Sequence, residues 1–189
     1  MSYRNANCSD NRPMQRQSQL SNTLRRLWME HVMWTRSFII STASNLGDLQ
    51  YVSDRLLRNP SDFADVLRPF YGNETAMTFK NLLTDHLLIA ADLVNAAKAG
   101  DTKTADEKRI KWYNNASDIA DFLSEINPYW SRSVWQTMFY DHLEMTENEA
   151  AQILGGQYAA SISQYDSIQK EALEMADYMT SGINRQFKL

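Results

Sequence analysis

Each of the three histidines in this 189-residue chain directly follows an acidic residue, as Glu30-His31, Asp85-His86 and Asp141-His142. Successive histidines are 55 and 56 residues apart along the sequence. Each lies on the apolar stripe of a different predicted helix, so a helical bundle would bring the three imidazoles inward. Neutral imidazole is a common ligand of iron, zinc, copper and nickel. The pattern therefore predicts a transition-metal site.

The acidic residues of these pairs have a separate predicted role. Adjacent helical residues point about 100° apart, so an acid cannot share the inward face with the histidine that follows it. We expect Asp85 and Asp141 to lie at helix seams and to orient histidines of neighbouring helices through the second ring nitrogen. At least two of the three acids should then hydrogen-bond to a histidine or another polar side chain. For direct metal ligation, the first carboxylates to consider are Glu30, Asp118 and Asp166.

The alternative is that each histidine is a buried residue bonded to its own neighbour. Carboxylate di-iron bundles carry Glu-x-x-His on two helices, but here the residues three positions before the histidines are Trp28, Leu83 and Phe139. Imidazoles that share a metal require ring separations of about 4–7 Å, whereas separations above about 10 Å exclude a shared mononuclear site. The ring separations therefore decide between the two interpretations.

Apolar side chains recur every three or four residues along most of the chain, which is the period of an amphipathic helix. Cap and stop residues divide this pattern into long helices over residues 22–46, 74–98, 102–126, 132–154 and 158–187. Short helices are predicted on either side of Asn59-Pro60, a turn at Gly72, and a helix restart at the capping box Thr146–Glu149. We expect an all-α, antiparallel four- or five-helix bundle, ferritin-like or related, with short extra helices.

Residues 1–19 are rich in Asn, Ser, Gln and Arg, and are predicted to form a flexible polar tail before a single domain over residues 20–189. The tail lacks the apolar segment of a secretory signal, and no apolar run elsewhere is long enough to span a membrane. Cys8 is the only cysteine, so no intrachain disulfide can form. We therefore predict a cytoplasmic protein that does not contact membranes.

The net charge argues against nucleic-acid binding, and the absence of one sequence motif argues against a nucleotide cofactor. The net charge is −4, whereas nucleic-acid binding requires clustered Lys and Arg side chains that neutralise phosphates. The sequence also contains no glycine-rich phosphate loop, which argues against a nucleotide cofactor.

Several segments carry a resemblance to known proteins: residues 27–36, 55–60, 69–72, 96–101 and 126–130, together with the segment around Asp141-His142. In these segments the chain resembles a family of small bacterial helical-bundle proteins whose members often carry the label acetylglutamate kinase. The resemblance implies a helical bundle. The kinase label implies an α/β protein with phosphate loops, which this sequence does not predict. The Glu-His-x-x-Trp stretch of residues 30–34 is also similar to ferritin-like bundles, and that similarity implies metal binding.

Two function classes follow from these features. The first is a metal-binding bundle that stores or senses a metal or performs redox chemistry with oxygen. The second is a non-enzymatic structural or interaction protein that presents helical faces to a protein partner or to a second copy of itself. The sequence leaves open whether the protein is an enzyme.

Overall fold

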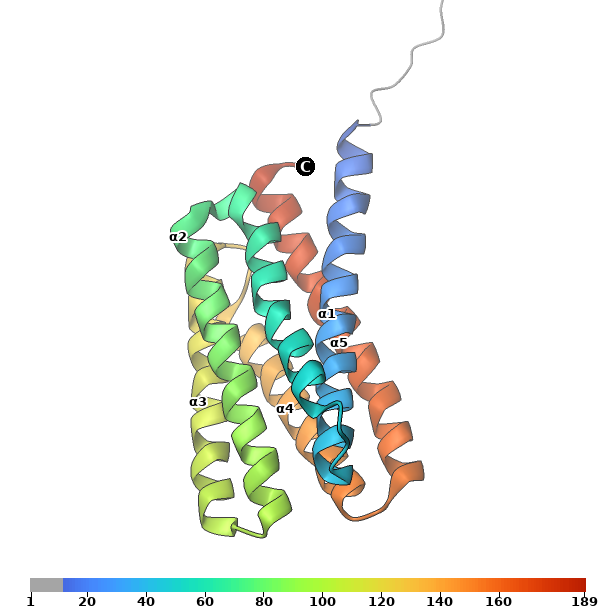
Figure 1. The fold of residues 1–189 in the computed structure, drawn as a ribbon. Helices are drawn as coiled ribbons and strands as arrows, with labels where there is room; N and C mark the ends of the chain where they lie inside the picture. The colour runs from blue at the N-terminus through green and yellow to red at the C-terminus, as the bar shows by residue number, and fades with distance from the viewer. Residues whose placement is uncertain (1–11) are drawn as a thin grey trace, which may run out of the picture.

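The computed structural model describes residues 12–189, which form five α-helices joined by short loops (Figure 1). The helices are α1 (Arg12–Ser44), α2 (Leu49–Ala99), α3 (Thr102–Ile126), α4 (Arg132–Leu154) and α5 (Tyr158–Phe187). No β-strand occurs among these residues, which confirms the predicted all-α bundle, whereas the ferritin-like arrangement is not confirmed. Within the same residues, no helix combines the length and apolarity needed to cross a membrane.

The helix α2 differs from the expected series of short helices, because it continues through Pro60 and Pro69. A proline inside a helix removes one hydrogen bond and costs about 3 kcal/mol. Burial offsets this cost, since Asn59, Pro60 and Phe63 are all buried against neighbouring helices. The predicted turn at Gly72 is present as a kink with φ of 82° and ψ of 171°, a conformation that strongly favours glycine. Residues 49–71 and 73–99 therefore act as two helices.

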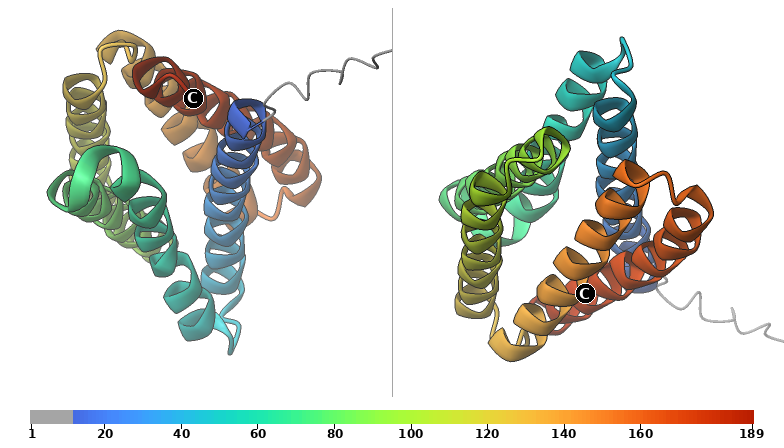
Figure 2. Two further views of the ribbon diagram at one scale, coloured as in Figure 1. Left: turned by 90° about the horizontal axis from the view of Figure 1, so that it is seen from above. Right: turned by 90° about the horizontal axis from the view of Figure 1, so that it is seen from below.

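With α2 divided at Gly72, the chain forms three helical hairpins of similar length. Hairpin 1 comprises α1 and residues 49–71, hairpin 2 comprises residues 73–99 and α3, and hairpin 3 comprises α4 and α5. The first helices of the three hairpins run in the same direction, and the second helices run back (Figure 1). Viewed along the bundle, the helices enclose a triangle (Figure 2). Contacts between α1 and α5 close it, so the first helices bring equivalent positions to one level around a common axis.

The loops within the hairpins repeat as well. Asn45, Gly100 and Gly156 have φ values of 52°, 71° and 72°, and each lies in the loop of one hairpin. Each of these left-handed residues follows the histidine of its hairpin by 14 positions. A left-handed residue at a helix end allows the chain to reverse, and glycine or asparagine adopts it at the lowest cost. The three hairpins therefore share the same geometry although their sequences show little identity.

Two local predictions require correction. The first helix begins at Arg12 and not near Ser21, so residues 12–19 are helical; the remaining tail, with Cys8, lies outside the described residues. The predicted restart at Thr146–Glu149 is absent, because α4 is continuous from Arg132 to Leu154. Thr146 and Glu149 are buried, and the Glu149 carboxylate is used for an ion pair with Arg36 of α1 rather than for a helix cap.

A close contact between α5 and the loop before α4 gives a stability prediction. A Cβ atom at Gly182 would overlap the indole of Trp130, which packs against Tyr71 and Trp135 and donates a 3.3 Å hydrogen bond to the Tyr178 carbonyl. We expect Gly182→Ala to lower the free energy of unfolding by about 1–2 kcal/mol, because overpacking costs more than the roughly 1 kcal/mol of helix propensity gained.

Urea denaturation measures this effect. The control is Ser163→Ala, at an exposed position of the same helix, where we expect a change within about 0.5 kcal/mol. A Gly182→Ala protein that is as stable as the wild type would contradict tight packing of Trp130 against α5.

Candidate metal centre

The three histidines meet at the centre of the bundle. His31, His86 and His142 are 2%, 1% and 2% exposed, and one ring nitrogen from each lies within 4.8 Å of the other two. The ring centroid of His31 is 6.2 Å from that of His86 and 5.7 Å from that of His142. These separations fall in the range expected for imidazoles that share a site. The convergence predicted from the sequence is therefore confirmed, and we call these residues the histidine cluster.

The partners of the Nδ1 atoms determine which nitrogen faces the centre. The Nδ1 atom of His31 lies 3.2 Å from Asn59 Oδ1, and that of His86 lies 2.9 Å from Asn115 Oδ1. An amide oxygen can only accept a hydrogen bond, so both Nδ1 atoms carry the proton. In the neutral ring the lone pair is then on Nε2, which is the atom left to bind a metal. His31 and His86 are therefore held in the tautomer that leaves Nε2 without a proton.

Both asparagine amides are fixed in turn by the helix that carries the histidine. The Nδ2 atom of Asn59 donates a 3.0 Å hydrogen bond to the Leu27 carbonyl, and that of Asn115 donates a 3.1 Å bond to the Leu82 carbonyl. Leu27 and Leu82 each precede the histidine of their helix by four residues. Since the donor and acceptor ends of each amide are both engaged, the amide cannot rotate without losing a hydrogen bond.

Hairpin 3 departs from this pattern in one chemical respect. The Nδ1 atom of His142 lies 3.1 Å from Oε2 of Glu171, a carboxylate in place of an amide. Its other oxygen, Oε1, is buried and has no hydrogen-bond partner in the described part of the chain. A carboxylate that accepts from a histidine raises the basicity of the ring and balances part of a bound cation's charge. Glu171 thus places a negative charge directly behind the histidine cluster.

These three partners were missed in the sequence, although a signal for them exists. The separations from each histidine to its partner are 28, 29 and 29 residues. A polar residue recurring at this distance on an otherwise apolar face, in each hairpin, is the pattern that identifies Asn59, Asn115 and Glu171. For Asn59, the helix break predicted at Asn59-Pro60 hides this signal, because it removes the residue from the buried face.

The acidic residues chosen from the sequence lie elsewhere. Glu30 accepts hydrogen bonds from Arg26 and Arg55, and these bonds lower its pKa against the opposing effect of burial. Asp85 and Asp141 are exposed and form no side-chain hydrogen bond within the described residues. The orienting role expected of these acids therefore belongs to Asn59, Asn115 and Glu171.

The other two proposed carboxylate ligands, Asp118 and Asp166, are also not part of the histidine cluster. Asp118 is exposed and lines a shallow groove on the outer face between α2 and α3, which it shares with Asp85. Asp166 is exposed on α5. Within the described residues, the group of mutually close ligand atoms contains the three histidines and none of these acids. The centre is thus an all-imidazole set.

Burial keeps His31 and His86 neutral. Together with the charge of the nearby His142, and against the hydrogen bond that His31 donates to Asn59, burial lowers the pKa of His31 to about 3. Burial likewise lowers the pKa of His86 well below its ordinary value, with His31 and His142 adding to the effect. A proton in this site would be poorly solvated and close to two other rings. The lone pairs of His31 and His86 therefore remain available at neutral pH.

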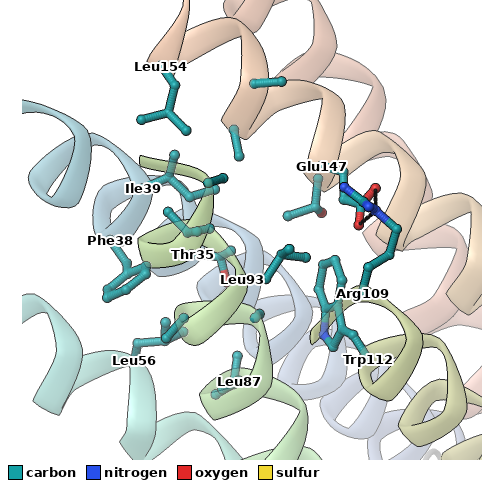
Figure 3. Close-up of a pocket in the computed structure, with 17 residues that line it drawn as sticks. Thr35, Phe38, Ile39, Leu56, Leu87, Leu93, Arg109, Trp112, Glu147 and Leu154 are labelled. Atoms are coloured by element: carbon teal, nitrogen blue, oxygen red, sulfur yellow. Dashed lines mark hydrogen bonds and ion pairs between the residues drawn. The ribbon is translucent and has the colours of Figure 1, made fainter. Parts of the chain in front are cut away.

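The two sides of the histidine cluster are packed differently. Toward the N-termini of the three helices that carry the histidines, the neighbouring layers are filled by large side chains that are at most 1% exposed: Trp28, Leu83, Phe139, Leu24, Phe79 and Trp135. Toward the hairpin loops, the residues one turn after the histidines are small: Thr35, Ala90 and Thr146. These three line a cavity of about 110 Å³ (Figure 3). The cavity thus lies on the loop side of the cluster, one helical turn from the three histidines, which do not themselves line it.

An ion pair closes the triangle beside this cavity. Arg36 of α1 donates to the Glu149 carboxylate of α4 and, at 3.1 Å, to the Ser161 carbonyl of α5. The Arg36 side chain is 17% exposed and that of Glu149 is 2% exposed. Burial raises the pKa of Glu149, while Arg36 and the nearby His142 lower it. The pair therefore joins hairpin 1 to hairpin 3 on the loop side of the histidine cluster, five residues after His31 and seven residues after His142.

Comparison with protein-family models, with curated proteins and with solved structures gives no match for this chain. The chemistry of the centre is accordingly inferred from its geometry.

Proposed function

We propose that the protein binds one divalent transition-metal ion through the Nε2 atoms of His31, His86 and His142. The observation that carries this proposal is the convergence of three buried imidazoles, each fixed through Nδ1 by a polar side chain of the following helix. Histidines that serve packing alone do not need their lone pairs directed at one another. An imidazole with its second nitrogen hydrogen-bonded to a carboxylate or amide is the usual arrangement of a metal ligand.

Zinc is the first ion to test. Three neutral nitrogen ligands with a fourth position left for water or substrate are typical of catalytic zinc sites, and structural zinc sites are closed by four protein ligands. Iron, copper and nickel also accept imidazole, so competition among the four ions decides the identity. A single mononuclear centre is poorly suited to metal storage. The open side toward the cavity favours catalysis or sensing, in which a ligand reaches the metal.

Metal binding is tested on untagged protein that has been stripped with a chelator and titrated with Zn²⁺. We expect one ion per chain, because a single histidine cluster exists among the described residues. At a free concentration about 100 times the Kd, binding should stabilise the fold by about 2.7 kcal/mol and raise the melting temperature by roughly 5–10 °C. Calorimetric titration and thermal denaturation give the two readouts.

The variants His31→Asn, His86→Asn and His142→Asn should each lower Zn²⁺ affinity by more than about 100-fold, since loss of only an outer partner costs about 10–100-fold. The matched controls are Asp85→Asn, Asp118→Asn and Asp166→Asn, exposed acids that should leave the affinity unchanged. Circular dichroism establishes that each variant is folded. A folded wild-type protein that binds none of the four ions would leave the structural or interaction bundle as the function.

A further inference from the structure

The geometry points to a ligand for this centre: we infer that the cavity beside the histidine cluster binds a short-chain monocarboxylate, whose head group takes the open metal position. This inference rests on the proposed metal site and adds the class of molecule that reaches it. It is carried by three features of the cavity: its walls, its charge balance and one hydroxyl group.

The walls of the cavity are predominantly apolar and come from all three hairpins. The contributing side chains include Ile39 of α1, Val94 of α2 and Ala150 of α4, each eight residues after the histidine of its hairpin. Figure 3 shows the aliphatic side chains on one side of the cavity and Arg109 beside Glu147 on the other. A cavity of about 150 Å³ admits benzene, so the 110 Å³ found here suits an alkyl chain of about four or five carbon atoms.

The charge balance favours a single negative charge on the ligand. A divalent ion held by three neutral imidazoles brings a charge of about +2 into a buried site. Glu171 supplies one negative charge behind His142, and the charge of Glu149 is already paired with Arg36. The centre is thus left with about +1, which a monoanion neutralises.

The rim of the cavity does not favour a second charge. Its lining contains one cationic side chain, Arg109, which is already engaged by the carboxylates of Glu147 and Asp106. A dianion would therefore find no free cation for its second charge among the described lining residues. The expected ligand has one charged end at the metal and an apolar body in the cavity.

The hydroxyl of Thr146 offers a hydrogen bond to the charged end of the ligand, which a carboxylate can accept. Thr146 follows His142 by one helical turn, lines the cavity and is 5% exposed. Its Oγ1 atom has no hydrogen-bond partner within the described part of the chain, whereas the equivalent Thr35 donates to the His31 carbonyl. A buried hydroxyl without a partner is costly, and a bound oxygen would relieve that cost. A carboxylate can place one oxygen on the metal and accept from Thr146 with the other.

The test uses protein loaded with Co²⁺, whose visible absorption reports the coordination of the ion. Acetate, propionate, butyrate and valerate are titrated in turn, with butanol as the neutral control. We expect a spectral change with each acid. The affinity should rise by about fourfold for each added methylene, since burying one methylene contributes about 0.8 kcal/mol to binding. Butanol should leave the spectrum unchanged.

Three variants separate the contributions. Ala150→Leu fills the cavity, so it should abolish the gain in affinity with increasing chain length while leaving acetate binding and the Co²⁺ spectrum intact. If Ala150→Leu does not fold, Ala91→Phe fills the cavity from another lining position. Thr146→Val should weaken butyrate by about tenfold through loss of one hydrogen bond. Glu171→Gln should tighten butyrate by about tenfold, because the centre gains one positive charge.

The outcomes distinguish this inference from the proposed function. Failure of the wild-type protein to bind Co²⁺ would overturn both. Normal Co²⁺ binding with no response to butyrate, or with an equal response to butanol, would overturn the carboxylate ligand alone and leave the metal site standing. If the affinity does not change with chain length in the wild type, as expected for Ala150→Leu, the cavity does not hold the alkyl chain. That result would also overturn the inferred carboxylate ligand.

Discussion

Replacing Arg36 by methionine is expected to lower the free energy of unfolding by about 3–5 kcal/mol, which is the usual cost of removing one partner from a buried ion pair. The substitution leaves the Glu149 carboxylate almost fully buried without its cation. It also removes the hydrogen bond from Arg36 to the Ser161 carbonyl, which connects α1 to α5. Since α1 and α5 close the triangle of hairpins, the loss should affect the whole fold.

Chemical denaturation of two further variants establishes the cause. Arg36→Met combined with Glu149→Gln should recover most of the loss, because the buried negative charge is then absent. Arg25→Met breaks an exposed pair with Asp177, whose side chains are 41% and 53% exposed, and should cost less than about 1 kcal/mol. Equal losses in Arg36→Met and Arg25→Met would contradict a special role for the buried pair.

The second large effect is a loss of stability of the metal-free protein on mild acidification. The unfolded chain takes up protons on its histidines below pH about 6.5, whereas folded His31, with a pKa of about 3, stays neutral. The unfolded state therefore binds more protons in this window, and stability decreases as the pH falls from 6.5 toward 3. Between pH 7 and pH 5 the decrease is about 2 kcal/mol for His31. The lowered pKa of His86 adds to the decrease in the same direction.

Urea denaturation in the presence of a chelator, at pH 7, 6 and 5, measures this dependence. The chain has three histidines in all, and each belongs to the cluster, so no other imidazole contributes. His86→Gln should reduce the slope of stability against pH by about one proton, whatever its effect on absolute stability. Asp85→Asn, which changes the exposed residue beside it, should keep the wild-type slope. A wild-type stability that is constant from pH 7 to pH 5 would be incompatible with neutral buried imidazoles.

The two effects have different consequences for a metal centre. The ion pair between Arg36 and Glu149 joins hairpins 1 and 3, which carry His31 and His142. The neutrality of His31 and His86 keeps their lone pairs free. A metal that binds Nε2 removes the penalty of burying three unpaired lone pairs, so the loss of stability on acidification should be smaller in the metal-loaded protein until the ion dissociates.

The sequence by itself determined the helical class and the inward position of the three histidines. Apolar residues at three- and four-residue spacing specify one buried face for each helix, and His31, His86 and His142 lie on those faces. The nearly equal separations of 55 and 56 residues further indicated helix and loop segments of similar length between the histidines. These are local properties, because they depend on residues within a few helical turns.

The tertiary structure alone decided which groups the histidines meet. The partner of each imidazole lies 28 or 29 residues further along and on another helix, so its identity depends on how two helices pack. Local rules expected a helix break at Pro60, whereas packing of Asn59 and Phe63 keeps α2 continuous and turns Asn59 toward His31. Conversely, Asp85 and Asp141 are exposed, whereas Glu30 lies between two helices and pairs with Arg55 of α2 instead of with a histidine. The cavity, too, exists only where small residues of three hairpins come together around one axis.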